Sequence, residues 1–230
     1  MNEESPGYVG RSVPRVEDER LVRGAGRFVA DLQVADVVDV AFLRSTQAHA
    51  LISRLDTSRA RSMPGVIAVY EAADIVDRIT PLVNAELRVP PGLAELGPIN
   101  KVQPVPILTS PEVSYVGQPI AMVVAESRYL AEDAVELIEI DYDELPAVVD
   151  LELAVGPDAP LVLIDEEDNI AVHIRHGKGD AARAIANAAF VVTDTFSTQR
   201  HVCAPLETRG ILAQQDPFSG ALTVWSSTQT

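Results

Sequence analysis

Cysteine is nearly absent from this sequence, since Cys203 is the only one in 230 residues. A single thiol cannot form an intrachain disulfide, and it cannot build a metal site from several thiolates. The sequence therefore excludes a disulfide-stapled fold and a cysteine-rich metal site, and it favours a reducing compartment.

Long apolar runs and a secretory leader are also missing. The first ten residues, MNEESPGYVG, are acidic and lack the basic start and apolar core of a signal peptide. No apolar run approaches the roughly 18 residues that a membrane-spanning helix needs. We expect a soluble, cytoplasmic protein without membrane insertion.

Basic residues are scarce, with 18 Lys and Arg against 34 Asp and Glu and a formal net charge of −16. Such a charge repels phosphate backbones and argues against a nucleic-acid or anionic-membrane partner. Between Glu126 and Asp168 the chain carries fifteen acids and one base, Arg128. This segment is either a solvated acidic face, the interpretation we favour, or a docking surface for a basic partner.

Several catalytic motifs are not found. The glycine pairs at 24–26 and 177–179 follow no apolar strand in a GxGxxG or GxxxxGK[ST] frame, and no serine lies in a GxSxG sequence. His173 and His176 lack the carboxylate-histidine spacing of a metal site, and His201 with Cys203 makes a weak pair. His49, flanked by alanines, is better explained as a buried, hydrogen-bonded side chain than as a ligand.

The stretch from Val113 to Asp150 carries the clearest structural signal, which is strand, helix, strand. An apolar run at 120–125 predicts a buried strand, and Ser127 predicts a helix N-cap. The helix should end near Leu137 or Ile138, and the alternating residues Ile138, Ile140 and Tyr142 predict a half-buried strand.

Similar patterns extend to both sides of this block. Before it, we predict strands at 37–43, 52–56 and 66–70, a short helix capped by Asp56 or Thr57, and a proline-rich loop at 80–111. After it, we predict a helix capped by Asp180, a strand at 190–198, and a hairpin of 210–214 with 222–226.

These elements predict an α+β chain in four parts. Residues 1–23 form an extended N-terminal arm, 24–150 a first domain with interleaved strands and helices, 151–169 a linker, and 170–230 the start of a second domain.

Four blocks of the chain resemble, in order, the opening of the molybdopterin-binding large subunit of the xanthine dehydrogenase, aldehyde oxidase and carbon monoxide dehydrogenase family. They are GAGRFVADL at 24–32, RSTQAHALISRLDTSRA at 44–60, MPGVIAVYEAADI at 63–75, and the 113–150 stretch. LETRGILAQQD and GALTVWSSTQ near the end resemble the start of the family's cofactor-binding domain. The resemblance implies an α/β hammerhead domain at 24–150, followed by the beginning of a mixed α/β molybdopterin-binding domain.

The resemblance also implies a function. The whole enzyme would be a molybdenum hydroxylase that oxidises an aldehyde, an N-heteroaromatic compound or carbon monoxide. Its cofactor would be molybdenum-molybdopterin cytosine dinucleotide, and electrons would pass to [2Fe-2S] clusters and FAD. Because the chain lacks cluster-binding cysteines, these centres would lie on an iron-sulfur subunit and an FAD subunit, in a dimer of heterotrimers that includes the remainder of the large subunit. The catalytic glutamate would lie downstream, so this fragment alone should be inactive.

Gln229 is the first candidate site residue. The resemblance implies that its side-chain amide lies beside the molybdenum and donates a hydrogen bond to one of the metal's oxygen ligands. A neutral amide suits this task because it donates without adding charge or competing as a ligand.

Two further residues are weaker cofactor-binding candidates. Glu207, in the Pro205–Thr208 block, either orients backbone near the metal or pairs with Arg200 or Arg209; we favour the ion pair. Gln118, in the turn before Pro119, either faces a groove or makes a hydrogen bond that stabilises the turn. A different class of function stays open as well: the chain would then be a noncatalytic assembly module or small subunit that docks a partner.

Overall fold

The computed structural model describes residues 7–79, 82–83, 99–100, 104–173, 178–199 and 201–228. The chain divides into two compact units: Asp36–Val191, and a discontinuous unit made of Met1–Ala35 with Val192–Thr230. The α+β class predicted from the sequence is confirmed, and the four predicted domain boundaries stay a prediction.

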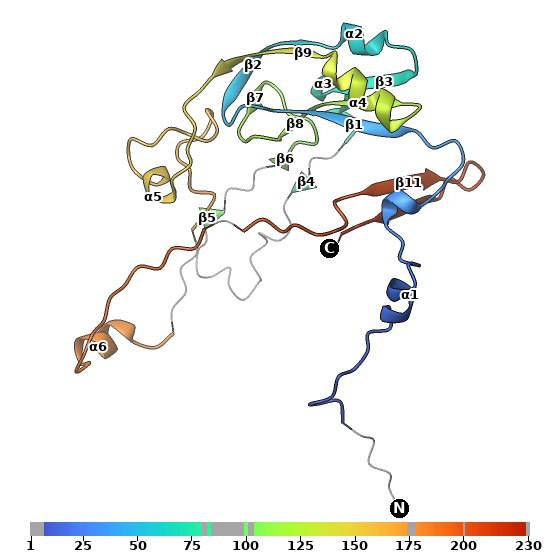
Figure 1. Cartoon of the computed structure of the whole chain (residues 1–230). Helices are drawn as coiled ribbons and strands as arrows, with labels where there is room; N and C mark the ends of the chain where they lie inside the picture. Colours follow the sequence, from blue (N-terminus) through green and yellow to red (C-terminus); the bar gives the residue numbers. More distant parts are fainter. Residues whose placement is uncertain are drawn as a thin grey trace, which may run out of the picture. The chain divides into compact units, whose positions relative to one another are not determined.

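A three-stranded antiparallel sheet forms the larger unit's first layer. Its strands lie in the order β1 (Asp39–Arg44), β8 (Pro119–Ala125) and β3 (Val66–Glu71). Figure 1 shows this sheet beside the helix α4 (Arg128–Glu136). The sequence of β8, PIAMVVA, is apolar throughout, as suits a strand paired on both sides.

Helix α4 covers one face of this sheet. The Ser127 hydroxyl accepts a hydrogen bond from the Leu130 N–H at 3.4 Å, so the predicted N-cap is confirmed. Ala131 and Ala134 on the helix are fully buried against a core that contains Val69 and Val123. Small residues on the helix let it approach the sheet closely.

A second sheet, in the order β7 (Glu112–Val113), β2 (Ala50–Asp56) and β9 (Glu139–Glu144), lies in the same unit. Ala50, Val113 and Ile120 make a separate core cluster. Helix α2 (Ser58–Arg61) begins where the Asp56 carboxylate accepts the Ser58 N–H at 3.0 Å, and α3 (Ala72–Ile75) follows β3. Of the two predicted caps for α2, Asp56 provides the side-chain bond.

The proline-rich segment at 80–111 is not irregular throughout, which corrects the prediction of a plain loop. β4 (Leu82–Val83) pairs with β6 (Pro104–Val105), and β5 (Ile99–Asn100) pairs with β10 (Val172–His173). Each pairing joins residues far apart in sequence, so no local pattern could predict it.

The segment predicted to be a linker is ordered. Asp150 caps α5 (Leu151–Ala154) by accepting the N–H groups of Glu152 and Leu153, each at 2.9 Å. The Asn169 side chain accepts from Val162 N–H and donates to the carbonyl groups of Ala154 and Pro160. One amide therefore closes the segment into a loop.

Helix α6 (Ala181–Ala186) begins at Asp180, whose carboxylate accepts the Arg183 N–H at 3.0 Å as predicted. The prediction of a strand at 190–198 is wrong, because these residues form no strand in the structure. Strand geometry needs a neighbour for its N–H and C=O groups, and none of the strands described pairs with this segment. Phe190, Val192 and Phe196 are accordingly 91%, 91% and 89% exposed.

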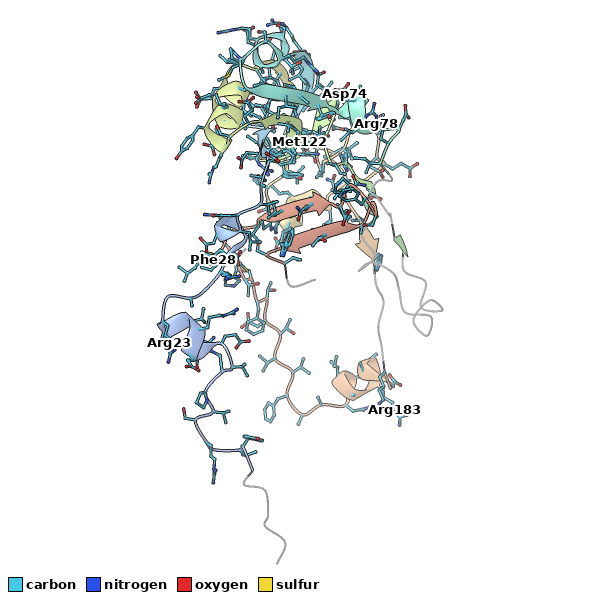
Figure 2. All side chains as sticks on the ribbon, turned by 90° about the vertical axis from the view of Figure 1, so that its right-hand side faces the viewer. Arg23, Phe28, Asp74, Arg78, Met122 and Arg183 are labelled. Carbon is cyan, nitrogen blue, oxygen red and sulfur yellow. The ribbon has the colours of Figure 1, made fainter. Side chains whose placement is uncertain are left out.

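The smaller unit holds α1 (Asp18–Val22), the 3₁₀ turn η1 (Val29–Asp31), and the hairpin of β11 (Ile211–Gln215) with β12 (Leu222–Ser226). Figure 2 shows α1, with Arg23 at its end, as a separate turn on the ribbon. The predicted hairpin is confirmed, and α1 lies in the arm that was predicted to be extended. None of residues 7–35, 192–199 and 201–228 is buried, so the described part of this unit has no core of its own.

Candidate functional site

Glu207 joins two segments of the smaller unit that are far apart in the sequence. Its Oε1 accepts the backbone N–H of Val29 at 2.8 Å, a contact between residues 178 positions apart in sequence. No ion pair joins Glu207 to Arg209, both of which are described, and Arg200 lies outside the described residues. The side chain thus binds the backbone of Val29, in line with the first of the two predicted alternatives. The ion pair with Arg200 and the role toward a cofactor stay predictions.

Ser227 lies just beyond β12 and binds the start of the opposite strand. Its Oγ accepts the Gly210 N–H at 2.7 Å and lies 2.9 Å from the Thr208 carbonyl oxygen, to which it donates. The Ser227 N–H also donates to the Gly210 carbonyl at 3.1 Å. These bonds hold the chain immediately before Thr228.

Gly210 permits the close approach of Val29. A Cβ placed on Gly210 would lie 3.3 Å from the Val29 Cβ, which is tighter than ordinary van der Waals contact. We call Val29, Glu207, Gly210 and Ser227 the clasp. It joins the 24–32 block to the two ends of the hairpin.

The far end of the hairpin is fixed by Asp216. The N–H groups of Ser219 and Phe218 donate to its carboxylate, and these bonds lower the pKa of Asp216 below its ordinary value. The β11–β12 register pairs Ile211 with Ser226, so Ser227 is the first residue beyond the ladder. The turn at Asp216 fixes the register of the two strands, and the clasp fixes Ser227 where the chain leaves the hairpin.

Gln229 itself lies outside the described residues. Its predicted contact with a cofactor therefore stays a prediction. The sequence reasoning missed Gly210 and Ser227. The only local signal for them was a glycine before one hairpin strand and a hydroxyl residue after the other.

Gln118 lies in the larger unit and is 7% exposed. Its Oε1 accepts the Ser114 N–H at 2.7 Å across the turn that ends at Pro119. The turn-stabilising hydrogen bond weighed from the sequence is thus present, while the predicted cofactor contact stays a prediction.

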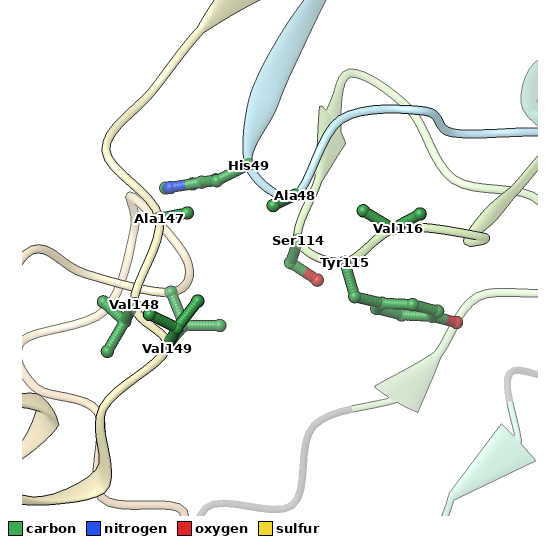
Figure 3. Close-up of a pocket in the computed structure, with 9 residues that line it drawn as sticks. Ala48, His49, Ser114, Tyr115, Val116, Ala147, Val148 and Val149 are labelled. Carbon is green, nitrogen blue, oxygen red and sulfur yellow. The ribbon is translucent and has the colours of Figure 1, made fainter. Parts of the chain in front are cut away.

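A shallow pocket in the larger unit lies beside His49 (Figure 3). Its walls are mostly small or apolar side chains: Ala48, Ser114, Tyr115, Val116, Ala147, Val148, Val149 and Val162. His49 is 6% exposed, with Nδ1 2.8 Å from the Pro146 carbonyl oxygen and Nε2 2.8 Å from Glu112 Oε1. The prediction of a buried, hydrogen-bonded histidine is confirmed.

Glu112 joins two parts of the larger unit, since its Oε1 also accepts the Ile164 N–H at 3.0 Å. We predict that Glu112→Ala lowers the free energy of unfolding by about 1–3 kcal/mol, because His49 loses its carboxylate partner inside the protein. Urea denaturation followed by circular dichroism measures this change. Glu144→Ala, at an exposed position on β9, is the control and should change stability little. Equal effects of the two variants would contradict the role given to Glu112.

Metal-ligating side chains are dispersed in the described part of the chain. No group of three or more His, Cys, Asp and Glu residues there could hold a metal ion. Cys203 and His201 are exposed, and His176 lies outside the described residues.

Among the helices that the structure describes, none has the length and apolar character to cross a membrane.

Two family profiles match the chain in succession. Residues 23–146 match the a/b hammerhead domain of aldehyde oxidase and xanthine dehydrogenase, and residues 163–230 match the molybdopterin cofactor-binding domain. The chain therefore belongs to the aldehyde oxidase and xanthine dehydrogenase family, which confirms the resemblance stated from the sequence.

Relatives with assigned names agree with this membership. The nicotine 6-hydroxylase large subunit of Paenarthrobacter nicotinovorans is 36% identical over 96% of this chain and 26% of its own length. The carbon monoxide dehydrogenase large chain of Afipia carboxidovorans is 38% identical over 94% of this chain and 26% of its own length. The chain thus spans about a quarter of the length of each of these two relatives.

The fold agrees with solved structures too. Quinoline 2-oxidoreductase from Pseudomonas putida 86 superposes with a TM-score of 0.78 at 35% identity, covering 97% of this chain and 27% of that one. Aldehyde oxidoreductase from Desulfovibrio gigas gives 0.75 at 26% identity, covering 94% and 23%. The fold predicted from the sequence, a hammerhead domain followed by the start of a molybdopterin-binding domain, is confirmed.

Proposed function

We propose that this chain is the N-terminal part of the large subunit of a molybdenum hydroxylase. The whole enzyme oxidises an aldehyde, an N-heteroaromatic compound or carbon monoxide. The succession of the two matched domains carries this proposal, and the matched cofactor-binding segment, 163–230, includes Gln229. The names of the relatives, a nicotine hydroxylase and a carbon monoxide dehydrogenase, support the substrate classes.

The smaller unit supports the proposal through its lack of a core. None of the described residues at 192–199 and 201–228 is buried, and Leu206 and Phe218 are 97% and 99% exposed. A segment of this kind gains stability only when further chain covers its apolar side chains. The remainder of the large subunit is the covering chain that we propose.

The residues of the smaller unit fit a cofactor that brings its own metal. Around the clasp lie hydroxyl and carbonyl groups and one carboxylate, Glu207, which is already engaged by the Val29 N–H. Neutral groups of this kind form hydrogen bonds without displacing a metal's ligands. In this proposal Gln229 donates its amide hydrogen bond to the cofactor, Glu207 orients the backbone beside it, and a bound molybdenum cofactor supplies the two-electron oxidation.

The finer assignments belong to the same proposal. The cofactor is the cytosine dinucleotide form of molybdenum-molybdopterin, and the partners are an iron-sulfur subunit with [2Fe-2S] clusters and an FAD subunit, in a cytoplasmic dimer of heterotrimers. Gln118 is a further, weaker cofactor contact. The name of another relative, subunit gamma of a 6-hydroxypseudooxynicotine dehydrogenase complex, supports a multisubunit assembly.

Metal analysis of the native complex tests the proposal. We expect molybdenum in equimolar amount to the large subunit, and dye reduction with an aldehyde, an N-heterocycle or carbon monoxide. The 230-residue chain alone should retain no cofactor and show no turnover. A complex purified from molybdate-fed cells without molybdenum would instead support the noncatalytic assembly module.

A further inference from the structure

The pocket beside His49 forms where three segments of the larger unit meet at one end of the second sheet. β2 is antiparallel to both β7 and β9, so the residues just before β2 lie beside those that follow the other two strands. Figure 3 shows these three segments, at 48–49, 114–116 and 147–149, around a common hollow of about 170 Å³. Val162 completes the wall.

The polar groups in the wall are already engaged. Both ring nitrogens of His49 have partners at 2.8 Å, the Pro146 carbonyl oxygen and the Glu112 carboxylate. The Ser114 hydroxyl donates to a side-chain oxygen at 3.3 Å. No ring nitrogen of His49 is therefore available as a general base, and the hollow is lined mainly by alanine, valine and the Tyr115 ring.

The size of the hollow fits one bulky apolar group, because an apolar cavity of about 150 Å³ can hold benzene. The rim is apolar as well. Val149 is 92% exposed, and Val116 and Tyr115 are also exposed. Adjacent apolar side chains of this kind on a protein surface mark an interaction site.

The chain around the pocket is acidic. The stretch from Asp143 to Asp168 supplies four of the nine wall residues and carries nine acids and no base. Glu144, at the pocket end of β9, is exposed. One base, Arg44, approaches the rim beside Val116, where it donates to the Gly117 carbonyl at 2.9 Å. The acids outnumber it, so this surface attracts a basic chain, while a net charge of −16 repels a second copy of the same chain.

We propose that this pocket is the apolar centre of a docking site for a separate, basic polypeptide, which inserts one bulky apolar side chain beside Val149. The inserted side chain supplies affinity, and the surrounding acids select a basic partner. Of the two interpretations of the acidic segment, the pocket thus favours the docking surface. The inference rests on the multisubunit assembly in the proposed function and is independent of the chemistry of the enzyme.

Photocrosslinking in the native complex tests the inference. The photoreactive amino acid p-benzoyl-phenylalanine is placed at position 149 of the complete large subunit, and the crosslinked peptide is identified by mass spectrometry. We expect a peptide of another subunit in which Lys or Arg residues flank a bulky apolar residue. Crosslinking to the large subunit itself, to a second copy of it or to a segment without basic residues overturns the inference, as does the absence of any crosslink.

Affinity measurements with the crosslinked subunit test the two contributions separately. Val149→Ser in the complete large subunit should raise the Kd on the order of 10-fold, and Val149→Lys should raise it further by adding repulsion. Val76→Ser is the matched control, because Val76 is an exposed valine at the end of α3 that is not part of the pocket wall. Raising the salt concentration from ~50 to ~500 mM should weaken binding of the unmodified protein several-fold.

The outcomes separate this inference from the proposed function. Equal affinities of Val149→Ser and the unmodified subunit overturn the docking site, and so does binding that is insensitive to salt. Neither result affects the expected molybdenum content or turnover of the complex. A native complex that lacks molybdenum but shows the expected crosslink would contradict the hydroxylase proposal and support the docking site.

Discussion

Replacing Gln229 by alanine in the complete enzyme is expected to lower kcat by about 10- to 100-fold while the melting temperature stays unchanged. In the proposed role the side-chain amide is a neutral donor, so its removal would take one hydrogen bond from the cofactor without altering charge. Outer contacts of this kind matter because they hold a metal site in one geometry before the substrate arrives. Steady-state kinetics with an artificial electron acceptor measure the effect.

The matched control is Gln214→Ala. Gln214 lies on β11 opposite Thr223 and is exposed, so its replacement removes the same kind of side-chain amide at a position without a proposed role. Gln229→Glu adds a second contrast, because it keeps the size of the side chain but replaces an N–H donor with a charged acceptor. It should slow turnover at least as much as alanine. Full activity of Gln229→Ala would remove the role proposed for this residue.

Local structure in the larger unit follows from local chemistry, which explains why the 113–150 block was predictable. Ser127 caps α4 because its hydroxyl reaches a free N–H three residues on, a contact that depends on neighbouring residues alone. The apolar run at 120–125 marks a buried strand because both of its edges are paired and the face that carries Ala121, Val123 and Ala125 is fully buried. Asp56, one residue before the N-cap Thr57, likewise binds a nearby N–H, that of Ser58 at the start of α2.

Structure that depends on distant residues was not predictable in this way. The alternating residues at 190–198 have the composition of a strand, yet they form none because a strand exists only where a second strand satisfies its backbone. The pairing of β5 with β10 shows the converse. Neither two-residue segment has a sequence pattern typical of a strand, and each becomes a strand only because the other lies beside it.

The candidate site shows the same division between local and distant information. That Glu207 needs a partner could be argued from its apolar and hydroxyl-rich surroundings, but the partner is a backbone N–H at Val29, 178 positions away. Backbone groups are identical in every residue, so no sequence pattern identifies this one. The hydrogen bond from the Gly210 N–H to the Ser227 hydroxyl likewise requires that these two residues lie opposite each other, which follows only from the hairpin register.

The second large effect is expected at Gly65. Gly65 has φ +86°, and a Cβ there would lie 2.6 Å from Leu130 Cδ1 on α4. Gly65→Ala should therefore lower the free energy of unfolding by about 2–4 kcal/mol, the sum of left-handed backbone strain and overpacking against the helix. Urea denaturation of the chain, followed by circular dichroism, measures the shift in midpoint.

Gly117→Ala separates the two causes. Gly117 has a similar φ of +91°, but nothing lies within 4 Å of a Cβ built there. It should cost only the backbone strain, about 1–2 kcal/mol. Leu130→Ala should cost less in the Gly65→Ala background than in the unmodified chain, because it also removes the methyl group that the new Cβ meets. Equal losses at the two glycines would mean that Leu130 moves aside freely and that α4 is not packed tightly against the turn before β3.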